Sequence, residues 1–321
     1  MDERDDSREA PPVLPGAERA WDVSPEAMAR FAEEVENFRE IARMLKPAPG
    51  ELPEVPGLEL AAVSRPLYDS LIGGDHLVWI DFKKRFDLPL RIANARRSGR
   101  DDVAERLATL RDRSGILLAD AAGHRITDAL VTAMLHQAFL LGTYYELDIN
   151  GEITTRLFQH LKQRFYESTG IRKFVTMLYG EVAGDGAFRF VSAGHPLPVI
   201  YSRLHERLVH ISRDCATVYT PLGMLPPEEE VDEPTEEVYR VPGRGYRVNE
   251  IHLMGQRDVM LLYTDGLADH GGGEFFRHRL EDCLRRHQDE SAEAIACGIA
   301  EDLDRFGPQE DDITYVIVRR T

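Results

Sequence analysis

Short apolar runs, each bounded by turn residues, recur along the chain and are typical of buried β-strands. Two of these runs flank the turn residues Ala-Gly-Asp-Gly at 183–186, which is a strong signal for a β-hairpin. We predict strands within the segments 58–67, 71–82, 115–118, 173–182, 187–195, 198–204, 206–211, 259–266 and 311–320.

Other stretches carry apolar residues at the spacing of an amphipathic helix. Strands and helices do not alternate one by one, so a doubly wound parallel sheet is disfavoured. The order instead favours an α+β fold in which antiparallel sheets carry helices on their outer faces. We predict helices within the segments 24–45, 101–113, 126–142, 152–169 and 290–306.

The N-terminal segment differs from the rest of the chain in composition. Residues 1–20 are charged and rich in Pro, Ala and Gly. The helix at 24–45 starts with Ser24 as its N-cap and Pro25 at its first helical position. This helix either packs on its own domain or serves as a regulatory or dimerising element, and the sequence leaves both readings open.

A proline-rich connector follows this helix. Four prolines within 46–57 end the helix and make the connector short and stiff. We therefore predict a flexible N-terminus with a linker helix over residues 1–50 and a single folded domain over residues 51–321.

Composition and charge narrow the classes of function. The chain has 321 residues and 43% hydrophobic content, enough for a sizeable core. Its net charge of −17 disfavours nucleic acid as a partner, because the phosphates would be repelled. Cys215, Cys283 and Cys297 follow no metal-binding or disulfide spacing. Without a signal peptide or an apolar run of about 18–20 residues, we expect a cytoplasmic protein with no membrane partner.

Acidic residues stand where several apolar strands end, next to glycine or other small residues. A single Asp-Gly at a strand end commonly forms only a turn. If these strand ends converge, however, the carboxylates repel one another, and a polyvalent cation or proton uptake relieves that repulsion. The acids in question are Asp75, Asp120, Asp265 and the pair Asp311 and Asp312.

The residue types point to hard cations. Sites built only from oxygen ligands suit Mg²⁺ or Mn²⁺, and the scarcity of cysteine argues against zinc. Two such ions, about 3.5–4 Å apart, can clamp a phosphate and acidify a water between them.

Seven stretches, in this order, resemble the PPM family of metal-dependent protein phosphatases (type 2C), in particular its bacterial SpoIIE/RsbU-like branch. TDG, DDIT and AGHP are weak signals singly, but at these separations they form a specific set. The stretches are GGDH (73–76), LLADAAGH (117–124), KFVTMLYGEV (173–182), FVSAGHPLPV (190–199), TPLGML (220–225), VMLLYTDGLADH (259–270) and DDITYVIV (311–318).

The resemblance implies an α/β/β/α sandwich of two antiparallel sheets with flanking helices, and a metal site at one edge. It implies two Mn²⁺ or Mg²⁺ ions and leaves a third open. Carried over by motif, Asp75 would bind the first metal and Asp120 would bridge both. The backbone carbonyl of Ala121 would also hold the first metal, while Asp265 and Asp311 would bind the second.

Two histidines are candidates for proton transfer. His124 could protonate the leaving serine oxygen, because the pKa of histidine suits a general acid. A Gly-His turn in such a position more often serves packing and backbone hydrogen bonding, and the same holds for His195. Asp312 and Asp269 are interpreted as capping groups or as support for the metal ligands.

The chain departs from the family pattern in three places without losing a predicted ligand. His76, Leu77 and Val78 stand where the family often has an aromatic pair and another acid. Arg125 replaces a glycine, and the charged segment 84–113 lengthens the gap between the first two acids. These departures affect the surface on which a substrate would dock.

The implied activity is that of a protein serine/threonine phosphatase, in which a metal-activated water hydrolyses phosphoserine or phosphothreonine. The expected substrate is a phosphorylated signalling protein such as an anti-sigma-factor antagonist. The segments 84–113 and 226–257 are candidates for selecting it, and the helix at 24–45 is a candidate for forming a homodimer. The alternative is a catalytically weak pseudophosphatase that acts as a docking scaffold in a partner-switching pathway.

Overall fold

The fold is given by a computed structural model. Its contacts divide the chain into one unit over residues 1–40 and a second over residues 41–321, and each is described by itself. The predicted flexible residues 1–20 and most of the acidic segment 226–257 lie outside the residues that the structure describes. The described ranges are 24–45, 52–67, 73–123, 126–168, 173–212, 214–224, 246–252 and 255–321.

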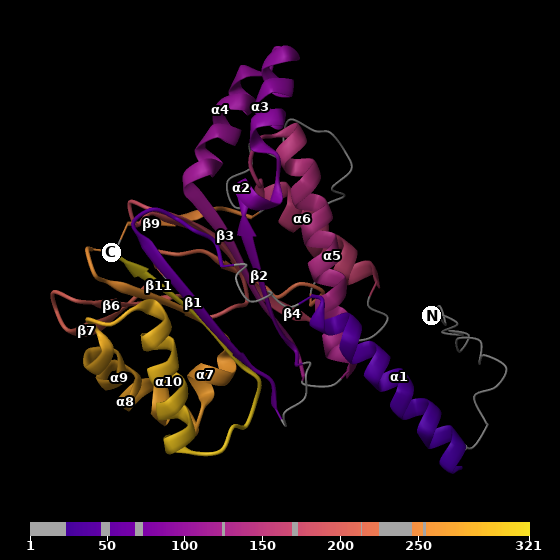
Figure 1. The fold of residues 1–321 in the computed structure, drawn as a ribbon, viewed down its shortest axis with the longest axis vertical. Helices are drawn as coiled ribbons and strands as arrows, with labels where there is room; N and C mark the ends of the chain where they lie inside the picture. Colours follow the sequence, from indigo (N-terminus) through magenta and orange to yellow (C-terminus); the bar gives the residue numbers. More distant parts are fainter. Residues whose placement is uncertain are drawn as a thin grey trace, which may run out of the picture. The chain divides into compact units, whose positions relative to one another are not determined.

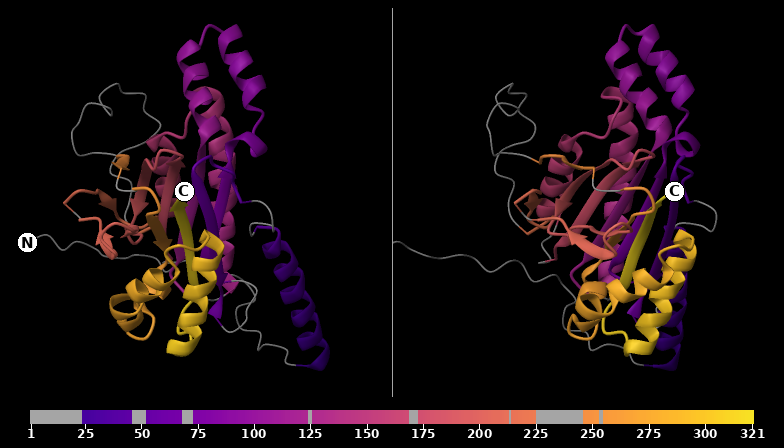
Figure 2. Two further views of the ribbon diagram at one scale, coloured as in Figure 1. Left: turned by 60° about the vertical axis from the view of Figure 1, so that its left-hand side comes forward. Right: turned by 90° about the vertical axis from the view of Figure 1, so that its left-hand side faces the viewer.

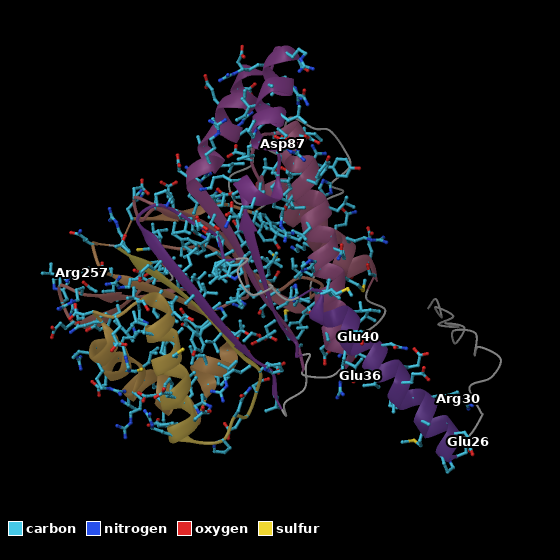
Figure 3. All side chains as sticks on the ribbon, viewed as in Figure 1. Glu26, Arg30, Glu36, Glu40, Asp87 and Arg257 are labelled. Atoms are coloured by element: carbon cyan, nitrogen blue, oxygen red, sulfur yellow. The ribbon has the colours of Figure 1, made fainter. Side chains whose placement is uncertain are left out.

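The predicted N-terminal helix is confirmed as α1, Pro25–Arg43. Ser24 is its N-cap, because its Oγ accepts a hydrogen bond of 3.2 Å from the N–H of Ala27. Charged side chains such as Glu26 and Arg30 project from this helix (Figure 3).

Two sheets form the centre of the second unit. The first has the strand order β1-β11-β10-β6-β7, and the second has the order β2-β3-β4-β5-β8, with β9 also paired to β5. The strands are β1 Leu58–Arg65, β2 Asp75–Asp81, β3 Arg113–Ala121, β4 Val175–Ala183, β5 Phe188–Ala193, β6 Val199–Ser202, β7 Arg207–His210, β8 Val218–Tyr219, β9 Asn249–Ile251, β10 Val259–Tyr263 and β11 Ile313–Arg320.

Helices cover the outer face of each sheet (Figures 1 and 2). Helices α5 and α6 cover the second sheet, and α7 to α10 cover the first. No helix within the described ranges is long and apolar enough to cross a membrane. The helices of this unit are α2 Phe82–Arg85, α3 Leu88–Arg97, α4 Asp101–Thr109, α5 Ile126–Ile149, α6 Thr155–Ser168, α7 Asp265–Asp269, α8 Glu274–His278, α9 Leu280–His287 and α10 Ala292–Phe306, with a 3₁₀ turn at Leu110–Asp112.

Strand β2 shows how the layers are held together. All seven of its residues are buried, because helices cover one face of its sheet and the other sheet covers the opposite face. Leu77 and Trp79 point into the core between the sheets, whereas Val78 and Ile80 point toward the helices. The α/β/β/α sandwich predicted from the resemblance is therefore confirmed.

The strand pairings are antiparallel as predicted, with one exception. The hairpin around 183–186 is confirmed by the pairing of β4 with β5. The short strand β8 runs parallel to β5, with Ser192 opposite Val218.

Helix α5 extends beyond its predicted end. The helix was predicted to end at Gly142, but α5 continues to Ile149. Gly142 serves close packing instead of ending the helix, because a Cβ at this position would collide with Leu157 of α6. The side that carries Ile126, Leu130 and Met134 is exposed.

The charged segment 84–113 folds into helices that join the core. Leu88, Ile92 and Leu107 are buried in the same cluster as the helix-facing side of the second sheet. Asp87 caps α3 by accepting a hydrogen bond of 3.0 Å from the N–H of Leu90 (Figure 3). The insertion is thus an integral part of the domain.

Arg91 fastens this insertion to α5. Its side chain is only 9% exposed and forms an ion pair with Asp148. Its guanidinium also donates to the carbonyl of Tyr144 at 3.3 Å and lies 4.3 Å from the centre of the Tyr144 ring. Three interactions of one side chain therefore hold α3 against the end of α5.

We expect Arg91→Ala to lower the free energy of unfolding by about 2 kcal/mol, because hydrogen bonds to charged groups contribute about 1.5–3 kcal/mol each. Urea denaturation followed by circular dichroism measures the change. The control is Arg96→Ala, an exposed arginine of the same helix, which should stay within about 0.5 kcal/mol of the parent. Equal losses in the two variants would contradict the anchoring role of Arg91.

Candidate functional site

The antiparallel topology brings the predicted acids to one end of the sandwich. Strand β2 begins at Asp75 and β3 ends next to Asp120, and these two residues are opposite each other in the pairing register. In the other sheet, the end of β10 and the start of β11 are likewise neighbours. Two strand ends from each sheet therefore meet at the same edge.

Side-chain alternation decides which way the first two acids point. Asp75 shares its face with Leu77, and Asp120 shares its face with Leu118. Both of these leucines belong to the core between the sheets. The two carboxylates therefore face the opposite sheet at the point where the apolar core ends.

Thr264 ties the two sheets together at this edge. Its hydroxyl donates a hydrogen bond of 2.8 Å to Oδ2 of Asp75, across the gap between the sheets. The same hydroxyl accepts a bond of 3.0 Å from the N–H of Thr314 in β11. One buried side chain thus sets the position of the Asp75 carboxylate relative to both strands of the other sheet.

Asp265 and Asp311 come from the first sheet, but neither is the last residue of a strand. Asp265 is the first residue of α7, and Thr264 is the N-cap between this helix and β10. A Cβ on Gly266 would collide with the carbonyl of Asp312, so glycine allows the helix to begin directly against β11. The predicted strand end at Asp265 is therefore a strand-to-helix junction.

The structure separates the roles of the neighbouring acids Asp311 and Asp312. Asp312 is buried, and its two carboxylate oxygens accept backbone hydrogen bonds of 2.6 Å each from Leu67 and Gly74. The Asp311 side chain lies at the exposed edge. Asp312 therefore holds the backbone on both sides of the connection that leads into β2.

The carbonyl of Ala121 also lies at this edge. The N–H of Ala121 donates a bond of 3.2 Å to the carbonyl of Gly74, which places the end of β3 beside the start of β2. A Cβ on Gly74 would lie only 2.7 Å from the Ala121 carbonyl oxygen. Glycine at position 74 thus keeps this carbonyl and the neighbouring carboxylates accessible to a ligand.

The carboxylates strongly disfavour one another's ionisation. Burial, and then the charges of Asp75, Asp265 and Asp311, raise the pKa of Asp120 to about 9. Burial also raises the pKa of Asp75, although the hydrogen bond from Thr264 opposes this shift. At Asp265, partial burial and the charge of Asp311 raise the pKa as well. Without a cation, burial and mutual repulsion therefore favour the protonated forms of these acids.

The types of ligand atom at this edge favour a divalent cation, whereas the spacing of the described side chains does not form a recognisable metal site. Carboxylate and carbonyl oxygens are the ligands that Mg²⁺ and Mn²⁺ prefer, and crowded like charges favour a cation. As it stands, however, no group of three or more His, Cys, Asp or Glu side chains in the described ranges is arranged to hold an ion. The donor types therefore fit a divalent cation, although the spacing of the side chains forms no such group in the described ranges.

Of the two candidate histidines, only His195 lies within the described residues. His124 and Arg125 lie outside the described residues. His195 is buried, and burial lowers the pKa of His195 to about 3, so its ring is neutral at physiological pH. Its Nδ1 lies 2.9 Å from the hydroxyl of Thr176. A neutral, buried ring of this kind is unsuited to be the general acid of the reaction.

Sequence reasoning missed Thr264 as a functional residue, and it interpreted Asp312 as a capping or supporting group without identifying its partners. Thr264 stands between a strand and Asp265, at the position of an N-cap, and this pattern is a signal that could have marked it. The role of Asp312 depends on its hydrogen bonds to Leu67 and Gly74, which are far away in the sequence. Such long-range contacts leave no local signal.

Comparison with known proteins identifies relatives of this chain. A family model described as Stage II sporulation protein E (SpoIIE) matches residues 111–321. Phosphoserine phosphatase RsbP of Bacillus subtilis (strain 168) is 27% identical over 180 residues, which is 55% of this chain. The matched region covers 38% of RsbP, so the chain corresponds to a part of that protein.

Solved structures share the fold. The RsbU and RsbW domains of Rv1364c from Mycobacterium tuberculosis match with a TM-score of 0.58 and 20% identity, covering 84% of this chain and 61% of theirs. The SiaA-PP2C domain of Pseudomonas aeruginosa gives a TM-score of 0.57 and 16% identity, with 92% and 98% coverage. The PP2C phosphatase domain of SpoIIE from Bacillus subtilis gives 0.56 and 14%, with 83% and 64% coverage.

We expect the metal-free protein to lose stability as the pH rises from 6 to 8.5. An unfolded aspartate loses its proton near pH 4, whereas folded Asp120 keeps its proton up to about pH 9. Between these values the folded state binds more protons, so stability falls as the pH increases. Asp120→Asn should flatten this slope and raise the melting temperature at pH 8.5 by about 2 °C or more.

Thermal melts in EDTA at several pH values measure this effect. Glu310→Gln is the control, because Glu310 is an exposed acid one residue before Asp311. It should leave the slope of the parent unchanged. A slope that is the same in Asp120→Asn as in the parent would show that Asp120 does not hold the additional proton of the folded state.

Proposed function

The chain belongs to the SpoIIE family of PP2C-type serine/threonine phosphatases, and we propose that it hydrolyses phosphoserine or phosphothreonine in a signalling protein with the help of two divalent cations. One observation carries this proposal. Acidic residues from both sheets meet at a single edge, where burial and mutual repulsion raise the pKa of Asp120 to about 9.

The proposed ligand set is the one that the family resemblance implies. Asp75, Asp120 and the carbonyl of Ala121 would hold the first ion at the end of the β2 and β3 pair. Asp265 and Asp311 would hold the second, and Asp120 would reach both. Mn²⁺ or Mg²⁺, when bound, supplies an acidified water and positive charge against the phosphoryl oxygens.

The surrounding residues would keep these ligands in position. The hydrogen bond from Thr264 orients the Asp75 side chain. Asp312 holds the backbone of Gly74, the residue before Asp75. Groups fixed in this way lose little freedom when a substrate binds, which is the purpose of preorganisation in an active site.

His124 remains the proposed donor of a proton to the leaving oxygen. It follows the acid of the second motif in the sequence. The alternative, His195, is held neutral by burial, and this supports assigning the proton transfer to another group.

A second candidate function is a pseudophosphatase that serves as a docking scaffold. The observation in its favour is the spacing of the carboxylates, because no group of three potential ligands in the described part of the chain is arranged to hold an ion as it stands. Metal binding distinguishes the two functions, since a scaffold does not need the carboxylates to close on a cation.

The substrate and partners are proposed by analogy with relatives. RsbP is named a phosphoserine phosphatase, and one of the matching structures joins RsbU and RsbW domains in one chain. We propose a phosphorylated anti-sigma-factor antagonist as the substrate. The N-terminal segment 1–50, with α1, would form a regulatory element and a homodimer contact, and residues 51–321 would form the catalytic domain.

We expect the full chain with Mn²⁺ to release phosphate from p-nitrophenyl phosphate and from serine-phosphorylated protein, and EDTA to abolish this release. Asp120→Ala should lower kcat/KM by about 100-fold or more, because removal of one group that stabilises the transition state costs about 10²–10³. Glu310→Gln should remain within about twofold of the parent, since surface changes away from the site have little effect.

Calorimetric titration with Mn²⁺ separates the two candidate functions. A phosphatase should bind the metal with loss of binding in Asp120→Ala and Asp265→Asn. A parent chain that binds no Mn²⁺ at millimolar concentration and releases no phosphate would leave the scaffold as the better description.

A further inference from the structure

A cleft of about 930 Å³ opens beside the acidic edge and includes Asp265 in its lining. Residues from both sheets form its walls, from β4, β6, β8 and β10 and from the connection between β5 and β6. Its volume lies at the upper end of the range of about 300–1,000 Å³ that is usual for ligand sites. Asp265 is the one proposed metal ligand among the described residues of this lining.

Apolar residues make up more than half of the cleft's lining, among them Leu197, Ile211 and Val218, and apolar and polar atoms share its surface about equally. Among its described lining residues there is no lysine, arginine or glutamate, and Asp265 is the one acid. The charged residue therefore marks the end at the acidic edge, and the rest of the surface suits an uncharged ligand.

The other polar residues in the described lining are Thr176, His195, His210 and Thr217. The Nδ1 of His195 lies 2.9 Å from the hydroxyl of Thr176. Its Nε2 makes no hydrogen bond within the described residues. Because burial lowers the pKa of His195 to about 3, its ring brings no positive charge to the cleft.

We propose that this cleft binds an uncharged, apolar stretch of the substrate chain directly next to the phosphoserine. The inference rests on the proposed phosphatase function, because only a phosphoryl group held at the acidic edge places its flanking residues beside Asp265. A charged residue in the cleft would exchange part of its water shell for apolar walls.

The exposed wall residue Val218 provides a test that does not disturb the core. Val218 is 40% exposed and lies in the edge strand β8. Val248 has almost the same exposure, 41%, and lies outside the cleft lining. Val218→Asp and Val248→Asp thus introduce the same charge at two equally exposed valines, of which one faces the cleft.

The experiment uses the full chain with Mn²⁺ and three serine-phosphorylated peptides. The residues on both sides of the phosphoserine are leucine in the first peptide, glutamate in the second and lysine in the third, and the peptides are otherwise identical. p-Nitrophenyl phosphate serves as the substrate without flanking residues. We expect kcat/KM for the leucine peptide to exceed the values for the other two by about tenfold or more, in the range that apolar pockets discriminate.

In Val218→Asp, we expect kcat/KM for the leucine peptide to fall by about tenfold. Its rate on p-nitrophenyl phosphate and its melting temperature should match those of Val248→Asp. Equal rates on the three peptides, or equal effects of the two variants, would overturn the assignment of the cleft and leave the phosphatase function intact. A parent chain that hydrolyses neither the peptides nor p-nitrophenyl phosphate would overturn the phosphatase function and this inference with it.

Discussion

Repulsion between carboxylates at one edge of the sandwich is the constraint on which the site depends. The antiparallel pairing of β2 with β3, and of β10 with β11, leaves no other place for the acids at these strand ends. Burial makes the repulsion stronger, because a low dielectric weakens the screening between charges. The apolar core that stabilises the fold thus also creates the charge density that a divalent cation would neutralise.

Hydrogen bonds stabilise the same edge. Thr264 connects the Asp75 carboxylate to β11, and Asp312 binds two backbone N–H groups with its own carboxylate. These bonds hold the edge in place while its acids disfavour one another. Functional sites commonly combine local destabilisation with support from the surrounding structure in this way.

Much of the fold and of the site could be predicted from the sequence, because the pattern of strand ends is local. Apolar runs that end in acids indicated Asp75 and Asp120, and the structure places these two residues opposite each other. Their role as metal ligands stays a prediction. The full length of α5 could not be predicted, because Gly142 ends a helix by propensity and is accommodated here only by contact with α6.

Other features could not be predicted because they depend on contacts between segments that are distant in the sequence. The helix that begins at Asp265 depends on the absence of a side chain at Gly266, where β11 passes close by. The insertion at 84–113 reads as a charged surface, but it contributes Leu88 and Leu107 to the main core. Sequence patterns describe neighbours along the chain, whereas these properties belong to segments that meet only after folding.

Asp312 connects the two halves of the acidic edge, which are the start of β11 and the start of β2. Asp312 follows Asp311 in the chain, and its carboxylate holds Gly74, the residue before Asp75. A displacement of the start of β11 is therefore passed to the start of β2 through one side chain and two backbone bonds. Binding at one half that moved Asp312 would alter the affinity of the other half, and by the same free energy in both directions.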